Sequence, residues 1–247
     1  MPTVRRYRKW AWGLGIASVT AVTAFGVASW QANAAPPPST PPAAAANEQP
    51  SVSDPNPGPA PVAGTGADAL TSSEIDKARK IAETTALTAD AKDVTGATGV
   101  EYLSAEIVEA DQGRRAELYY YDYKSNKLVK QVVDLATGKL AGSYSAAGLQ
   151  LPAADREVTT ALDMLLADPL ASDLKDAYKE ATGQPFAGKE GLVTTAHVFN
   201  AKAADTATRQ CGKHRCLQLI VQTKDGHIID LDKIIIDLSG RTVARLS

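Results

Sequence analysis

Hydrophobic and polar positions along the chain follow the same order twice. Each time, a helical pattern with apolar residues three or four positions apart gives way to short alternating or β-branched runs, which Gly- and Asn-containing turns separate. The two repeats contain the similar segments VVDLATGKL and IIDLSGRTV. Their aspartates, Asp134 and Asp237, lie roughly 100 residues apart, about the length of one small domain. We therefore expect a duplicated α+β module.

The first repeat begins with a helix. Thr71 followed by Glu74 is a capping-box pattern, and it predicts a helix over residues 72–87. Four strands are predicted after it, over residues 100–109, 115–123, 128–135 and 140–144. Their connections have the length of hairpin turns, which indicates an antiparallel sheet.

The second repeat has two helical patterns. The first follows Pro152 and should end near Asp168, because a residue that precedes proline is displaced from the helical region. Ser172 is expected to cap the second helix, and Gly183 to end it. Strands are predicted over residues 192–200, 217–223, 228–236 and 241–246. The fold class is therefore α+β, with two consecutive units of one or two helices followed by a four-stranded antiparallel sheet.

The N-terminal region has the organisation of an export signal. Residues 1–34 contain no acidic side chain, and a basic start with Arg5 and Arg6 precedes a weakly apolar run that reaches the small residues Ala32 and Ala34. The arginine pair suggests the twin-arginine route as an alternative to general secretion. Without cleavage, the apolar run would be long enough for a membrane anchor.

The remaining residues divide into a linker and two domains. Residues 35–69 are rich in Pro and Ala and are expected to form a disordered linker. The first α+β domain is predicted over 70–150 and the second over 151–247. The formal net charge is −2, and removal of the basic start makes it more negative. Nucleic acid is therefore an unfavourable partner, and the expected location is secreted or in the cell envelope. Membrane contact is expected only through an uncleaved signal.

Three short segments resemble a known family. LTSSEI, VVDLATGK and LADPL are similar to the N-terminal N2 and N3 domains of bacterial copper amine oxidases, over roughly residues 68–247. The resemblance implies two successive cystatin-like units. In that family the catalytic Asn-Tyr-Asp/Glu segment and three copper-binding histidines belong to another domain. This sequence contains no Asn-Tyr pair, and its only three histidines lie in the second unit, so we carry over neither the enzymatic activity nor copper as a cofactor.

The two cysteines are the first candidates for special chemistry. Cys211 and Cys216 form an even, closely spaced pair in a chain expected to be exported, which favours a disulfide. A Cys-His-Cys site for copper(I), built from both cysteines and His214, is the alternative. His197 and His227 have no neighbouring pattern of ligands or nucleophiles, and we predict no catalytic residues, metal site or cofactor.

A tyrosine-rich strand is the second candidate. Period-2 alternation places Tyr119, Tyr121 and Tyr123 on one face, and Leu118 and Tyr120 on the other. The face with the three tyrosines either packs between the two units or binds a partner.

These observations favour a non-catalytic, extracytoplasmic binding or scaffolding module whose partner is an unknown extracytoplasmic protein. One alternative is an accessory subunit of a separately encoded copper amine oxidase. A weaker resemblance to PepSY-type modules, whose hairpin also tends to place an Asp before a Thr-Gly-Lys-like turn, implies another: a regulator or inhibitor of an extracytoplasmic protease.

Overall fold

The computed structural model describes residues 62–110 and 113–246. The predicted export signal, with Arg5, Arg6, Ala32 and Ala34, and the linker up to residue 61 lie outside this range. No helix within the described ranges combines the length and the apolar character that crossing a bilayer requires.

The first half begins with the predicted capping box. Helix α1 spans Ser72–Ala82, and the side chains of Thr71 and Glu74 each accept a hydrogen bond from the other's backbone N–H. Arg114 also donates to both carboxylate oxygens of Glu74, at 3.3 and 3.1 Å. Burial alone would raise the pKa of Glu74, but the backbone donors and Arg114 hold it below its ordinary value. The predicted helix was too long: the chain leaves α1 at Glu83 and forms the separate turn α2, Thr85–Thr88.

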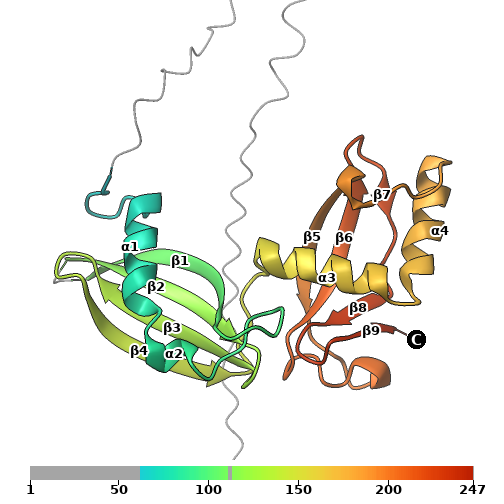
Figure 1. The fold of residues 1–247 in the computed structure, drawn as a ribbon. Helices are drawn as coiled ribbons and strands as arrows, with labels where there is room; N and C mark the ends of the chain where they lie inside the picture. Colours follow the sequence, from blue (N-terminus) through green and yellow to red (C-terminus); the bar gives the residue numbers. More distant parts are fainter. Residues whose placement is uncertain (1–61, 111–112, 247) are drawn as a thin grey trace, which may run out of the picture. The chain divides into compact units, whose positions relative to one another are not determined.

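Four antiparallel strands follow in the order β1-β2-β3-β4, and α1 lies across one face of their sheet (Figure 1). The strands are β1 Glu101–Ala110, β2 Gly113–Asp122, β3 Lys127–Asp134 and β4 Lys139–Ala147. The core beneath the helix consists of Ala78, Ala82, Ala116, Leu118, Tyr120, Val129 and Val133. The predicted strands are confirmed, and β4 extends three residues beyond the predicted end at Tyr144.

The second half contains two helices and a five-stranded antiparallel sheet, in which β5-β6-β8-β9 are neighbours and β7 pairs with β6. The helices are α3 Asp155–Ala167 and α4 Ala171–Thr182, with the short 3-10 turns η1 Lys189–Gly191 and η2 Thr206–Thr208. The strands are β5 Leu192–Phe199, β6 Cys216–Thr223, β7 Ile228–Ile229, β8 Ile234–Asp237 and β9 Thr242–Arg245. Helix α3 packs on β5, β6, β8 and β9, and α4 packs beside β7 (Figure 1).

Two predictions for this half were wrong. The strand expected over 228–236 is divided, because Asp232 donates its backbone N–H to the side chain of Asp230 and the chain forms a turn between β7 and β8. Ser172 does not cap α4: its hydroxyl donates to the carbonyl of Pro169, and Leu170 occupies the capping position. The predicted end at Gly183 is confirmed, since this residue adopts the left-handed conformation with φ 71°.

The turn after each repeated aspartate has the same hydrogen bond. A side-chain oxygen of Asp134 accepts the N–H of Thr137 at 2.8 Å, and one of Asp237 accepts the N–H of Gly240 at 2.7 Å. Such Asx contacts stabilise turns by satisfying a backbone donor locally. The sequence repeat therefore corresponds to a repeated local structure.

Besides the core beneath α1, a larger hydrophobic core contains residues of both repeats. Val94, Tyr121 and Tyr123 from the first repeat belong to the same buried cluster as Leu165 and Leu217 from the second. The boundary predicted between residues 150 and 151 lies in the segment that joins β4 to α3. Burial of apolar surface therefore couples the two halves.

Candidate binding surface

The three tyrosines of the candidate face have different environments. Tyr121 is 0% exposed and Tyr123 is 9% exposed, and their rings meet edge to face with centroids 4.9 Å apart. Both lie in the shared core, so the packing alternative is correct for them and they are not part of an accessible surface. Tyr119 is half-buried, and its hydroxyl donates to Glu117 at 2.7 Å.

A fully buried ion pair lies beside Tyr123. Arg215 and Glu157 have side chains that are both 0% exposed, and two nitrogens of the guanidinium bond the two carboxylate oxygens. The hydroxyl of Tyr123 donates to the same carboxylate. Burial alone would lower the pKa of Arg215, but the contact with Glu157 raises it. Burial, together with the charge of Glu157, raises the pKa of Tyr123 far above its usual value.

Arg215 also holds the segment between the two halves. Its guanidinium donates to the side chain of Gln150 and to the carbonyl of Leu151, both at 3.0 Å, and to the carbonyl of Pro152 at 3.1 Å. All of its polar contacts are with groups of the protein itself. This cluster therefore has a structural role, because it ties the segment between the halves to the core of the second half.

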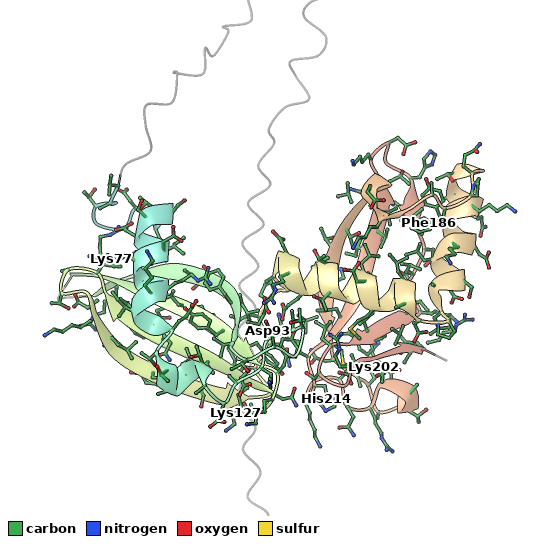
Figure 2. The ribbon with its side chains drawn as sticks, in the orientation of Figure 1. Lys77, Asp93, Lys127, Phe186, Lys202 and His214 are labelled. Carbon is green, nitrogen blue, oxygen red and sulfur yellow. A yellow bond between two sulfur atoms is a disulfide. The ribbon has the colours of Figure 1, made fainter. Side chains whose placement is uncertain are left out.

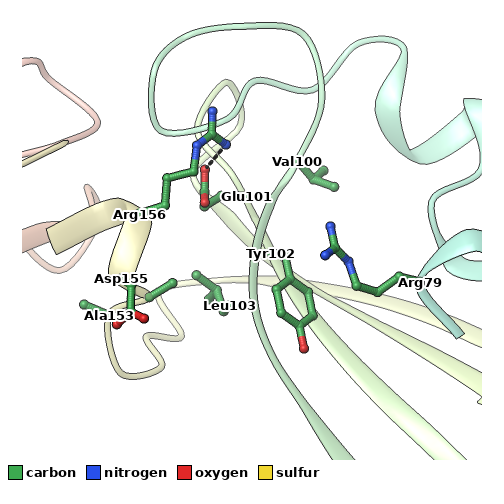
Figure 3. A pocket seen from close by; sticks show the side chains of 9 residues that line it. Arg79, Val100, Glu101, Tyr102, Leu103, Ala153, Asp155 and Arg156 are labelled. Atoms are coloured by element: carbon green, nitrogen blue, oxygen red, sulfur yellow. Dashed lines mark hydrogen bonds and ion pairs between the residues drawn. The ribbon is translucent and has the colours of Figure 1, made fainter. Parts of the chain in front are cut away.

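A pocket of about 470 Å³ lies where α1, β1 and the start of α3 approach one another (Figure 3). Arg156, in the wall of this pocket, forms ion pairs with Glu101 at 2.9 Å (Figure 3) and with Asp93 at 2.7 Å (Figure 2). Burial raises the pKa of Glu101. Burial alone would also raise the pKa of Asp93, but the hydrogen bonds from Thr95 and Arg156 hold it below its ordinary value. The pocket is lined by two cations, Arg79 and Arg156, and two acidic side chains, Glu101 and Asp155, so its formal charges balance and it is a poor candidate for binding a charged ligand.

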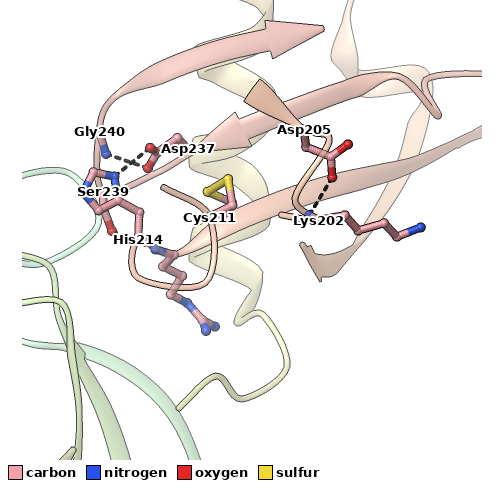
Figure 4. Close-up of a disulfide and its surroundings, with 9 residues drawn as sticks. Lys202, Asp205, Cys211, His214, Asp237, Ser239 and Gly240 are labelled. Atoms are coloured by element: carbon pink, nitrogen blue, oxygen red, sulfur yellow. Dashed lines mark hydrogen bonds and ion pairs between the residues drawn. A yellow bond between two sulfur atoms is a disulfide. The ribbon is translucent and has the colours of Figure 1, made fainter. Parts of the chain in front are cut away.

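The predicted disulfide is present between Cys211 and Cys216, with an S–S distance of 2.07 Å (Figure 4). The copper(I) alternative was wrong, because both sulfurs are bonded to each other. His214 instead bonds Asp237 through Nδ1 at 2.7 Å. His197 is exposed on β5, and His227 lies 3.4 Å from Asp225. The described residues contain no group of three or more His, Cys, Asp or Glu side chains arranged to hold a metal ion.

An apolar groove of about 260 Å³ follows the outer face of the first sheet, opposite α1. Tyr119, Lys130 and Tyr144 are cross-strand neighbours on this face, and Leu149 extends the groove beyond β4. Tyr144 is 60% exposed and Leu149 is 54% exposed. A Cβ atom at Gly142 would lie 2.8 Å from the ring of Tyr144. The ring can therefore occupy this position only because residue 142 is a glycine.

The polar groups in this groove already have partners. Glu117 accepts one hydrogen bond from Lys130 at 2.8 Å and one from Tyr119 at 2.7 Å. The ammonium group of Lys130 also lies 5.4 Å from the centroid of the Tyr144 ring. The groove therefore presents mainly carbon surfaces to a partner.

A second pocket, of about 430 Å³, lies on the other face of the same two strands. Ser143 and Ser145 from β4, Gln131 from β3 and Thr84 from the start of α2 contribute polar groups to it. Lys127, exposed at the start of β3, also lines it (Figure 2). The side chain of Gln131 is buried, and its Oε1 has no hydrogen-bond partner among the described residues. A buried acceptor without a partner is uncommon and costs stability.

Sequence reasoning missed Tyr144, Leu149 and Gln131. The only sequence signal is the segment Gly142–Ala146, in which serines alternate with other residues, and this pattern does not show that β4 lies at an edge of the sheet. The candidate surface thus consists of the edge strand β4 and the two pockets that flank it.

Comparisons with known proteins find likenesses among solved structures alone. No protein-family model matches the chain, and no curated protein matches it. The crystal structure of a copper-containing benzylamine oxidase from Hansenula polymorpha is similar with a TM-score of 0.45 and 10% sequence identity, over 74% of this chain. The chain spans 30% of the length of that oxidase. A distant neighbour in structure is thus a copper amine oxidase, and at this distance the likeness carries no argument about function.

Proposed function

We propose that this chain is a non-catalytic, extracytoplasmic binding module that recognises another protein through the outer face of its first sheet. The observation that carries the proposal is the groove around Tyr144 and Leu149, where two large apolar side chains are more than half exposed beside Tyr119. Clustered apolar exposure is typical of interaction sites, and tyrosine is enriched in the centre of interfaces. The disulfide fits an oxidising compartment outside the cytoplasm.

The proposal can be tested by affinity capture from the culture supernatant and envelope of the native host, followed by quantitative mass spectrometry. The variant Tyr144→Ser/Leu149→Ser should lose at least one protein that the original chain retains, with little change in melting temperature. Val193→Ser/Ile228→Ser, which alters two exposed apolar residues of the second sheet, is the matched control and should retain that protein. If both variants capture the same proteins as the original chain, the proposed surface is wrong.

The identity of the captured protein also separates the alternatives. A copper amine oxidase would favour the accessory-subunit hypothesis, and a protease would favour the PepSY-like regulator or inhibitor. Both alternatives require an activity assay of the captured enzyme with and without this chain.

A further inference from the structure

We propose that β4 accepts an extended peptide segment of a partner as an additional strand, and that this segment alternates apolar side chains with long hydrogen-bond donors. The inference rests on the proposed function, because it names the kind of partner that would occupy the same surface. Three separate features of β4 support it: its open edge, the apolar groove on one face, and the pocket on the other face, which polar and apolar side chains line together.

Strand β4 has an open edge with little protection against strand pairing. It pairs with β3 on one side, and no described strand pairs with its other side. Its residues are exposed or half-buried throughout, and its single charge is Lys139 at the first position. A bulge interrupts the pairing between Leu140 and Gly142, but the pairing from Gly142 to Ala147 is regular. Edge strands are usually protected by central charges, prolines or a covering segment, and an unprotected edge is a template for another strand.

The other edge strands differ in ways that favour β4, and β9, at the far edge of the second sheet, has only four residues. Strand β1 carries Glu101 and Glu106 and has a bulge between Tyr102 and Ser104. Strand β5 is also an open edge, but the pocket beside it, lined by Leu192 and other residues, lies on one face only. Pockets flank β4 on both faces, as recognition of alternating side chains requires.

The groove on the outer face suits apolar side chains. Lys130 and Tyr119 already direct their polar atoms to Glu117, so the surfaces of Tyr144, Leu128 and the Lys130 stem remain for contact. A medium-sized apolar side chain from an added strand would bury carbon surface there without leaving a polar group unpaired.

The pocket on the inner face suits a long donor. Gln131 pairs with Ser143 across β3 and β4, so an added strand would lie two strand spacings, roughly 9.6 Å, from the backbone of Gln131. A long side chain such as glutamine can pass over the small Ser143 and donate to the unpartnered Oε1 of Gln131. This hydrogen bond would satisfy the buried acceptor.

The same distance argues against a second copy of β4 as the occupant. A second β4 would bring Ser143 and Ser145 to the inner face, and their short hydroxyls do not span two strand spacings. A partner with longer donors therefore fits this pocket better than a second copy does.

The test uses the full chain and labelled peptides with blocked ends, with binding followed by fluorescence anisotropy. The first peptide alternates valine and glutamine over seven positions; a second has the same composition in valine and glutamine blocks; a third is the alternating peptide with N-methylated amides. We expect binding of the first peptide only, since block order misplaces the side chains and N-methylation removes the backbone donors. Bound peptide should also slow amide hydrogen exchange over 142–147 by about tenfold, with β5 unchanged. Equal binding of all three peptides, or no binding at millimolar peptide, would overturn the proposal.

One variant separates the pocket from general stability. Gln131→Met removes the unpartnered acceptor and should weaken binding of the alternating peptide roughly fivefold, equal to about 1 kcal/mol, without lowering the melting temperature. Gln222→Met, an exposed glutamine of β6, should leave binding unchanged. Unaltered binding by Gln131→Met would contradict the inner-face contact.

Two further results separate the possible failures. If the chain forms dimers without peptide, and if the dimers protect residues 142–147, the occupant is a second copy and the partner proposal is wrong. If no peptide binds but capture still depends on Tyr144 and Leu149, strand addition is wrong and the proposed function stands. If that capture fails as well, both are wrong.

Discussion

Replacement of Arg215 by methionine should destabilise both halves of the protein together. The change keeps an extended side chain but removes the cation that faces Glu157, whose side chain is 0% exposed. It also removes the donor from the side chain of Gln150 and from the carbonyls of Leu151 and Pro152. Buried polar groups that lose their partners are costly, and an uncompensated buried charge is the most costly of these.

The expected loss is large for a protein of this size. Breaking a buried ion pair by removing one partner costs about 3–5 kcal/mol, and the stability of a whole protein is about 5–15 kcal/mol. At roughly 2–4 °C per kcal/mol, Arg215→Met should lower the melting temperature by roughly 6–20 °C. Because the cluster lies against the shared core, both sheets should still unfold in one transition.

The assay is urea unfolding followed by far-UV circular dichroism, since all three tryptophans lie at positions 10, 12 and 30, outside the described structure. The double variant Arg215→Met/Glu157→Gln should recover about 2 kcal/mol or more of the loss, because the charge of Glu157 is then absent. A loss below about 1 kcal/mol for Arg215→Met would refute the reasoning. So would a double variant no more stable than the single one, because the buried charge would then not be the cause.

Three further predictions address other features. Tyr121→Ala should cost about 3–5 kcal/mol of unfolding free energy, whereas Tyr119→Ala should cost much less. Urea titrations of both variants would check this, and equal losses would contradict the placement of Tyr121, but not Tyr119, in the shared core. Replacing Cys211 and Cys216 together by alanine should lower the unfolding free energy by about 2 kcal/mol relative to the oxidised protein, because the disulfide no longer constrains the loop. An unchanged unfolding free energy would show that the disulfide does not stabilise the fold. Because folding lowers the pKa of Glu74, its carboxylate contributes to stability above the ordinary pKa of 4.5, and this contribution is lost as the pH falls through the pKa of the folded state. Glu74→Gln should therefore be less stable than the original chain at pH 7 and approach its stability near pH 3. A difference in unfolding free energy that grows on acidification would contradict this sign.

Local sequence signals predicted most of the helices and strands. The capping box at Thr71 and the left-handed glycine at Gly183 depend on residues within one turn, so the sequence contains all the information that is needed. The prediction failed over 228–236, because the hydrogen bond from Asp232 to Asp230 competes with the sheet ladder, and a β-branched pattern does not reveal this competition.

The candidate surface was much less predictable. Period-2 alternation correctly groups Tyr121 with Tyr123, but it does not show that residues of the second repeat cover them. In the same way, the exposure of Tyr144 follows from the position of β4 at an edge, and strand order depends on pairing between residues distant in sequence. Contacts of this kind are tertiary, and no local pattern encodes them.

The hydrogen bonds from Arg215 to Leu151 and Pro152 have a consequence for how this chain can evolve. After a duplication, a repeat usually remains a portable unit that recombination can copy, delete or join to another protein. Here the segment between the repeats serves as a spacer of fixed length, because its carbonyls must reach one buried side chain. Insertions there should therefore be eliminated by selection, while the turns at the outer ends of the sheets remain free to vary.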